Sequence, residues 1–316
     1  MTRAARRPRA AQHAVDGVLM LDKPAGITSH TAVQCVRRLL HARKAGHTGT
    51  LDPLATGLLP VCLGEATKFS HALLDADKTY LATIRLGITT TTGDLEGEMT
   101  AQAPVEVSEA QARAALSRFV GEILQVPPMY SAIKHGGQPL YKLARAGQDL
   151  PRTPRRVFIR ELTLIRFVPP ELDVSVTCSK GTYVRVLAED VGRELGCGGC
   201  LAGLRRTAVG EFSAAGMVTV ERLEALALQD RMALLLPADA LLSTLPRLDL
   251  DAGEAGRLQQ GQPVDRPDAR TPGLVRIYGA NREFLGMAEV IEPGRIVPRR
   301  LRSQPPSATE ATAGIS

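Results

Sequence analysis

An aspartate in an unusual loop is the first residue in this sequence that could do chemistry. Asp52 lies in the stretch GHTGTLDPLATGLLPVCLGEATK, among glycines, threonines and prolines, and His47 precedes it by five positions. The glycines indicate a backbone that another molecule can approach closely. The phosphate-binding pattern GxxxxGK[ST] is absent, so the stretch is not a P-loop. The structural alternative is that Asp52 and Pro53 cap and begin a short helix.

Arg185 is the second candidate, because it occupies a position that a helix disfavours. The segment TYVRVLAEDVGRELG predicts a helix closed by Gly196, with Arg185 in its first turn. The helix macrodipole is unfavourable for a cation there, so we expect a nearby anion. That anion is either Glu189, four residues later, or Asp52, brought from elsewhere in the fold. A pair with Asp52 would hold this carboxylate ionised, as a nucleophile must be, but the residues alone leave both pairings open.

Aromatic and lysine side chains gather in the same parts of the chain. Aromatic residues are only 3% of the sequence, and four of the five tyrosines fall in loop or motif regions: Tyr80, Tyr130, Tyr141 and Tyr183. An RNA site needs flat faces on which bases stack, although ordinary strand or loop packing is the plain alternative. The chain has far more arginines than lysines, and no lysine follows Lys180. All the lysines lie in or near the motif segments, which indicates that compact ammonium groups are needed in those segments.

Composition narrows the class of protein. A chain of 316 residues can form one large and one small domain without disulfides or metals. Four arginines near the N-terminus supply +4 of the net charge of +6 and predict a disordered basic arm over residues 1–14. A second basic cluster lies between Lys134 and Arg156, which is typical of a polyanion partner or of a solvated face.

Targeting and metal signals are weak. No apolar run approaches the roughly 18 residues of a membrane span, and five scattered cysteines indicate a reducing cytoplasm. The CGGC pair at 197–200 has no second pair of ligands elsewhere, so we expect small residues in a turn and no metal.

Periodicity and capping signals predict the elements that position these residues. We expect helices in TSHTAVQCVRRLLHA, in SEAQARAALSRFVG with a Ser108–Gln111 capping box and Gly121 as its stop, and between about 220 and 242. Strands are predicted in KTYLATIRLG and LDVSVTCS. The basic stretch from Gln125 to about Pro154 is predicted to be a long, mobile loop with a function. From Pro246 helix signals fade, and two strands, GLVRIYGAN and REFLGMAEV, predict a small β-rich domain.

Several blocks, taken in order, resemble one family. They are LDKPAGITSH (21–30), GHTGTLDPLATGLLPVCLGEATK (46–68), KTY (78–80), VPPMYSAIKHGGQPLYKLARAG (126–147), CSKGTYVRVLAEDVGRELG (178–196) and LRRTAVGEF (204–212). Together they resemble the bacterial tRNA pseudouridine synthases of the TruB family, which modify the T-loop uridine of tRNA, position 55 by convention. In one departure, Thr91 stands where the family pattern TDTxDxxG has its first Asp, while Asp94 is kept.

The resemblance implies an α+β fold with a mixed, mostly antiparallel sheet. It places a catalytic domain at 15–245 with flanking helices and a basic thumb loop at about 125–153, a PUA-like β-barrel at 246–303 and a disordered tail at 304–316. Asp52 would be the catalytic residue paired with Arg185. Substrate contacts are expected from His47 at the RNA, Tyr80 stacked on the flipped uracil, Tyr183 and Leu204 lining the pocket, and Lys23 and Lys68.

The implied reaction isomerises uridine in tRNA to pseudouridine without any cofactor. A hydrolytic glycosidase usually needs two carboxylates, whereas only Asp52 is prominent here. The expected partner is the T stem-loop of tRNA, and we expect a cytoplasmic monomer that does not enter membranes. The alternative is a tRNA-binding folding factor whose catalysis is secondary or absent.

Overall fold

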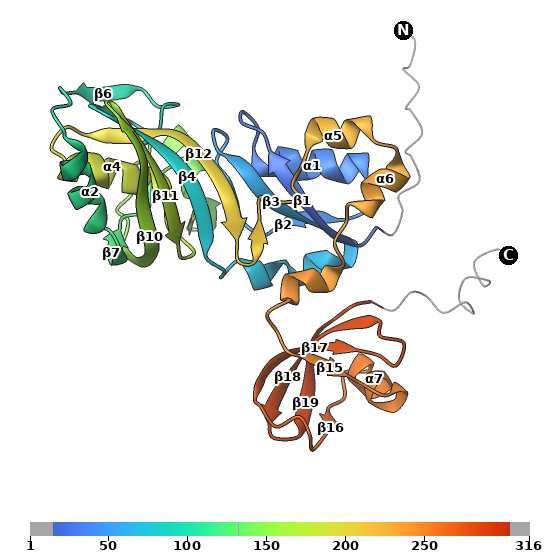
Figure 1. The fold of residues 1–316 in the computed structure, drawn as a ribbon. Helices are drawn as coiled ribbons and strands as arrows, with labels where there is room; N and C mark the ends of the chain where they lie inside the picture. The colour runs from blue at the N-terminus through green and yellow to red at the C-terminus, as the bar shows by residue number, and fades with distance from the viewer. Residues whose placement is uncertain (1–14, 132, 304–316) are drawn as a thin grey trace, which may run out of the picture.

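The computed structural model describes residues 15–131 and 133–303. The expected basic arm and C-terminal tail lie outside these described residues. The chain forms a large sheet flanked by helices and a smaller sheet near its C-terminal end (Figure 1). None of the helices in the described part of the chain is both long and apolar enough to cross a bilayer.

The large sheet is mixed and mostly antiparallel, as predicted. Its strand order is β14-β1-β3-β12-β4-β11-β10-β7, with β2 paired to β3 and β13 to β12. Among the strands that the structure describes in this sheet, only β1 with β14 and β12 with β3 pair in parallel. The strands are β1 (Gly17–Lys23), β2 (Ala45–His47), β3 (Thr56–Leu63), β4 (Lys78–Leu86), β7 (Gly121–Gln125), β10 (Arg155–Val168), β11 (Glu171–Cys178), β12 (Gly199–Val209), β13 (Phe212–Ser213) and β14 (Val218–Thr219).

Helices flank this sheet where capping and periodicity predicted them. The Thr28 hydroxyl caps α1, and the Ser108–Gln111 capping box begins α2, although α2 ends before Gly121, which instead begins β7. The helices are α1 (Ser29–Leu39), α2 (Glu109–Ser117), α4 (Val184–Glu194), α5 (Val220–Ala225) and α6 (Leu228–Ala233), with 3-10 helices η1 (Gly64–Leu73) and η2 (Ala238–Leu242). A hairpin of β5 (Ile88–Thr90) and β6 (Met99–Gln102) completes this part.

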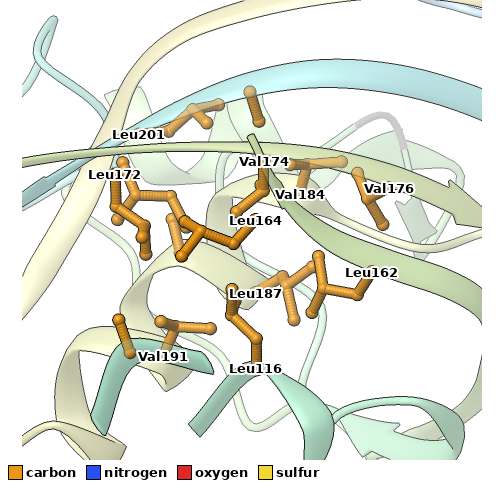
Figure 2. Close-up of a cluster of buried hydrophobic side chains, with 14 of the residues drawn as sticks. Leu116, Leu162, Leu164, Leu172, Val174, Val176, Val184, Leu187, Val191 and Leu201 are labelled. Atoms are coloured by element: carbon orange, nitrogen blue, oxygen red, sulfur yellow. The ribbon is translucent and has the colours of Figure 1, made fainter. Parts of the chain in front are cut away.

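Apolar side chains fill the space between α2, α4 and one half of the sheet. In β11 every second residue is buried, as the alternation of LDVSVTCS predicted. Figure 2 shows Leu172, Val174 and Val176 of this strand above Leu187 and Val191 of α4. A second cluster packs α1 against β1 and β3 in the other half. These two clusters lie side by side along the sheet, and a third cluster packs β1 and β3 against η1 and η2.

The stretch expected to be a structureless loop contains regular elements, which corrects that expectation. A short hairpin, β8 (Lys134–His135) and β9 (Gln138–Pro139), leads directly into α3 (Leu140–Arg145). Gly136 and Gly137 both have positive φ and form the hairpin turn. Turn glycines and a helix of six residues leave little periodic signal, which is why the sequence pattern missed them.

The C-terminal part forms its own five-stranded sheet with one helix (Figure 1). The predicted strands GLVRIYGAN and REFLGMAEV are β17 and β18, and they pair antiparallel. The helix α7 was not predicted, although Asp251 and Glu254 form a capping box at its start. The elements are β15 (Arg247–Asp249), α7 (Ala252–Gln259), β16 (Val264–Asp265), β17 (Gly273–Tyr278), β18 (Phe284–Glu292) and β19 (Arg295–Leu301).

Candidate active site

A pocket opens where the cluster under α2 and α4 meets the cluster under α1. Tyr80 of β4 and Leu204 of β12 are the partly buried side chains that pack against both clusters. They line a pocket of about 290 Å³ together with Asp52, Tyr183 and Arg185. Five of the eight predicted site residues therefore lie in one cavity, although they come from four separate segments of the chain.

The loop that carries Asp52 is not a helix, which excludes the structural alternative of a short helix beginning there. The loop runs between β2 and β3, and three side chains hold its backbone. Ser29 of α1 accepts a hydrogen bond from the Leu51 amide at 2.8 Å and donates to the Leu51 carbonyl at 3.0 Å. The Lys23 ammonium donates to the carbonyls of Pro53 and Ala55, at 3.3 and 2.7 Å.

Arg206 of β12 also bonds to the backbone of this loop and to the start of β3. Its guanidinium donates to the carbonyls of Leu58 at 2.7 Å, Gly49 at 3.2 Å and Thr50 at 3.5 Å. The residue is only 1% exposed, and burial lowers its pKa while Tyr80 opposes that shift. Because backbone carbonyls carry partial negative charge, they compensate this buried cation and fix the loop at the same time.

Strand register places Tyr80 beside Arg206. The two residues are paired across β4 and β12, and Arg206 is paired with Gly57 of β3 on its other side. Burial raises the pKa of the Tyr80 phenol, and the charge and hydrogen bond of Arg206 partly oppose that shift. The phenol is therefore neutral at physiological pH, and its ring forms a wall of the pocket.

Arg185 forms an ion pair with Asp52, one of the two anions that the sequence offered for it. Arg185 Nε lies 2.9 Å from Asp52 Oδ2 and 3.6 Å from Asp94 Oδ2. The other two guanidinium nitrogens donate to the carbonyls of Thr92 at 3.0 Å and Tyr130 at 2.7 Å. No ion pair joins Arg185 to Glu189 within the described residues. All three nitrogens are engaged, so the arginine is held in one orientation.

Asp94 is buried and both of its carboxylate oxygens have partners in the protein, whereas Asp52 is partly exposed. One of its oxygens accepts hydrogen bonds from the Thr92 hydroxyl at 2.5 Å and the Glu96 amide at 3.1 Å, and the other faces Arg185. The Asp94 side chain is 5% exposed, whereas the Asp52 side chain is 37% exposed. Thr91, at the departure from the family pattern, accepts a hydrogen bond from the Glu98 amide. Asp52 is thus the carboxylate that a ligand in the pocket can reach.

Lys23 is not among the residues that line the pocket, and its contact with substrate stays a prediction. The residue is 0% exposed, and its ammonium donates hydrogen bonds to the carbonyl of Pro24 and to the loop carbonyls of Pro53 and Ala55. Burial lowers the pKa of Lys23 to about 8, although the nearby Asp52 charge raises it in part. The structure gives Lys23 the role of supporting the Asp52 loop.

His47 and Lys68 lie outside the pocket. The His47 Nδ1 accepts a hydrogen bond from the Gly49 amide at 3.3 Å, and burial together with Arg206 lowers its pKa, so the ring is neutral. Lys68 of η1 pairs with Glu65 at 2.7 Å and donates to the Leu301 carbonyl at 3.0 Å. Lys68 therefore lies where the large sheet's 3-10 helix meets the end of β19, and an RNA contact from it would be made at that junction.

Three polar residues of the site were missed as candidates. Arg206 stands next to a second arginine, Arg205, so its separate role was not apparent. Neighbouring residues of a strand face opposite sides of the sheet. Arg205 pairs with Asp22 at 2.7 Å, whereas the Arg206 side chain is buried. Lys78 is buried and caps three carbonyls at the end of η1. Gln125, 2% exposed, accepts a hydrogen bond from the Tyr183 amide and so positions the start of α4.

Three family models match consecutive parts of the chain. "TruB family pseudouridylate synthase (N terminal domain)" matches residues 37–184. "tRNA pseudouridylate synthase B C-terminal domain" matches residues 185–243. "Pseudouridine synthase II TruB, C-terminal" matches residues 246–301.

Known relatives are similar over nearly their whole length. A protein of Burkholderia mallei named tRNA pseudouridine synthase B is 55% identical over 307 residues, which cover 95% of this chain and 98% of the relative. A protein of the same name from Methylobacillus flagellatus is 53% identical over 290 residues, covering 92% and 96%.

The fold is also similar to that of solved structures. A chain in the crystal structure of the archaeal box H/ACA sRNP Nop10-Cbf5 complex superposes with a TM-score of 0.70 at 25% identity, covering 93% of this chain and 88% of that chain. A chain of a Cbf5-Nop10-Gar1 complex gives 0.67 at 26% identity, covering 91% and 82%. Fold, site and matches together define the class: the protein is an enzyme with a pseudouridine synthase fold. The chain belongs to the TruB family of pseudouridylate synthases.

Proposed function

We propose that this enzyme converts the T-loop uridine of tRNA, position 55 by convention, to pseudouridine, with Asp52 as the catalytic carboxylate. The observation that carries the proposal is the partly exposed Asp52 in the pocket, paired with Arg185 at 2.9 Å beside Tyr80 and Leu204. The relatives named tRNA pseudouridine synthase B support tRNA as the substrate. Their names do not favour the alternative of a folding factor without catalysis.

The single available carboxylate supports isomerisation over hydrolysis. Pseudouridine forms when the bond between N1 of uracil and C1′ of ribose breaks, the base turns, and C5 bonds to C1′. C5 loses a proton and N1 gains one, so product and substrate have the same composition. A hydrolase usually needs a second carboxylate to activate water. Asp94 is unsuited to that role because its oxygens are buried and bonded to protein groups.

The pocket supports a mechanism in which the base leaves the RNA stack. A nucleotide inside a folded T-loop must be flipped out to reach Asp52, which costs a few kcal/mol. The Tyr80 ring offers a flat face to the flipped base, and Leu204 and Tyr183 complete the walls. Asp52 then acts on the bound nucleotide while Arg185 holds its orientation.

Basic side chains beside the pocket support the T stem-loop as the partner. Lys142 and Arg145 of α3 are exposed, and the main chain at Tyr130, earlier in the same 125–153 segment, bonds directly to Arg185. We infer that this segment acts as a thumb that contacts the RNA backbone. One chain supplies Asp52, Arg185 and Tyr80, so the proposed acting unit is a monomer. The proposed location is the cytoplasm, where tRNA is processed.

The test is tritium release from T stem-loop RNA that carries tritium at C5 of the target uridine. We expect release by the intact protein and a loss of at least about a thousandfold in Asp52→Asn, with RNA binding retained. Asp268→Asn, which changes an exposed aspartate in the turn between β16 and β17, is the matched control and should release tritium normally. Free uracil as product would indicate a hydrolase, and binding without any release would indicate a folding factor.

A further inference from the structure

Two side-chain hydroxyls in the pocket lack hydrogen-bond partners. Thr48 Oγ1 and Ser131 Oγ are the only buried hydroxyls without a partner among the residues that the structure describes. The two residues are 1% and 5% exposed, and both line the pocket that holds Asp52. A buried hydroxyl without a partner destabilises the folded protein, so its presence at a pocket wall points to a ligand that completes it.

Ser131 reaches the pocket through contacts that fix its backbone. The preceding carbonyl, of Tyr130, accepts a hydrogen bond from Arg185 at 2.7 Å. The Ser131 amide donates to the Met129 carbonyl at 2.9 Å, and the Ser131 carbonyl accepts from the Tyr141 amide at 3.1 Å. Every backbone polar group of Ser131 is therefore used within the protein, and only the hydroxyl remains.

The Tyr183 phenol does not satisfy the Ser131 hydroxyl. Burial raises the pKa of Tyr183, and an interaction with Ser131 lowers that pKa in part, so the two hydroxyls are close. They nevertheless do not meet in hydrogen-bonding geometry. The Ser131 hydroxyl keeps the capacity both to donate and to accept.

Thr48 contributes the second hydroxyl from another segment. Its amide donates to the Pro60 carbonyl at 3.3 Å, which ties it to β3 in the loop that carries Asp52. Ser131 comes from the 125–153 segment. The two unused hydroxyls thus converge on one cavity from elements far apart in the sequence.

We propose that the hydroxyls of Ser131 and Thr48 bind the flipped uridine through hydrogen bonds to its polar atoms. This inference rests on the proposed function, because it requires a nucleotide in the pocket. Tyr80 and Leu204 contact a base through its faces, and a stacked base keeps polar groups at its edge that also need partners. The two hydroxyls are substrate-binding residues beyond the aspartate, arginine and pocket walls described above.

The first test compares Ser131→Ala, Thr48→Val and the double variant with the intact protein. We expect kcat/KM for tritium release to fall about tenfold in each single variant, because each loses one hydrogen bond to the substrate. The melting temperature of the free protein should stay equal or rise, since each change removes an unsatisfied hydroxyl. Thr163→Val, an exposed threonine on β10, controls for the chemical change and should alter neither quantity.

The second test pairs Ser131→Ala with substrates altered at single atoms: 2-thiouridine, 4-thiouridine, N3-methyluridine and 2′-deoxyuridine at the target position. If Ser131 binds one of these atoms, the loss from the variant and the loss from that substrate will be non-additive. Additive losses with all four substrates, unchanged kcat/KM, or a fall in melting temperature would each overturn the inference. Absence of tritium release by the intact protein would instead overturn the proposed function.

Discussion

Asp52 and Arg185 are 133 residues apart in the sequence, yet their side chains meet at 2.9 Å. The arginine is 4% exposed and bonds to two backbone carbonyls as well, so the aspartate is held against a rigid partner. The carbonyl of Tyr130 links this pair to the 125–153 segment. The position of that segment and the orientation of the Asp52 carboxylate are therefore connected through one guanidinium.

Replacing Arg185 by lysine should reduce the rate although it keeps the charge. A single ammonium group cannot bond to Asp52, Thr92 and Tyr130 together, so the carboxylate loses its fixed orientation. We expect the single-turnover rate of tritium release to fall about a hundredfold or more. Arg193→Lys, on the exposed face of the same helix and paired with Asp190, should react at the normal rate. A normal rate in Arg185→Lys would mean that charge alone is required.

We expect the aromatic ring of Tyr80 to contribute more to the rate of tritium release than its hydroxyl does. Tyr80→Phe removes the interaction with Arg206 but keeps the flat wall, so we expect only a few-fold lower rate. Tyr80→Leu fills similar space without a stacking face, and stacking contributes about 1–3 kcal/mol per base, so kcat/KM should fall about tenfold or more. Measuring both variants under single-turnover conditions separates the two contributions. Equal rates in Phe and Leu variants would exclude stacking.

Burial of Lys23 should make stability depend on pH in a defined window. The folded-state pKa of Lys23 is about 8, below its ordinary value of 10.5, because burial disfavours the charge. Between these values the unfolded chain binds the additional proton, so this group's contribution to the free energy of unfolding rises with pH, by up to about 3 kcal/mol.

The comparison of the intact protein with Lys23→Met isolates this contribution. The variant should be less stable throughout, since two loop carbonyls lose their donor. The difference in free energy of unfolding should widen from pH 8 to pH 10.5, as measured by urea denaturation at a series of pH values. Parallel pH curves for the two proteins would show that Lys23 titrates normally.

Gly57 should tolerate no side chain, because it sits against β12. Its φ is +97°, and a Cβ there would lie 2.3 Å from the Arg206 carbonyl oxygen. We expect Gly57→Ala to lower the free energy of unfolding by about 3 kcal/mol or more and to displace the Asp52 loop. Gly46→Ala, in the same motif but with open space around the position, should change stability little. Thermal melts of the two variants test this contrast, and similar melting temperatures would contradict it.

Local signals were sufficient for the regular elements near the site. The Thr28 cap and apolar spacing identified α1, the alternation of LDVSVTCS identified β11, and the position of Arg185 in the first turn of α4 followed from the same spacing. Capping and periodicity depend on residues within a few positions of each other, so the sequence carries them directly. The short β8–β9 hairpin and α3 were missed because they are too brief to show a period.

The sequence by itself determined which residues could react, and the tertiary structure decided which of them meet. From the sequence, Glu189 and Asp52 were equally suitable as the anion that pairs with Arg185. The register of β4, β12 and β3 places the Asp52 loop beside α4, so the pair forms with Asp52. Burial likewise separated Lys23, which supports that loop, from the side chains that line the pocket. Ion pairing and burial depend on segments far apart in the chain, and only packing brings such segments together.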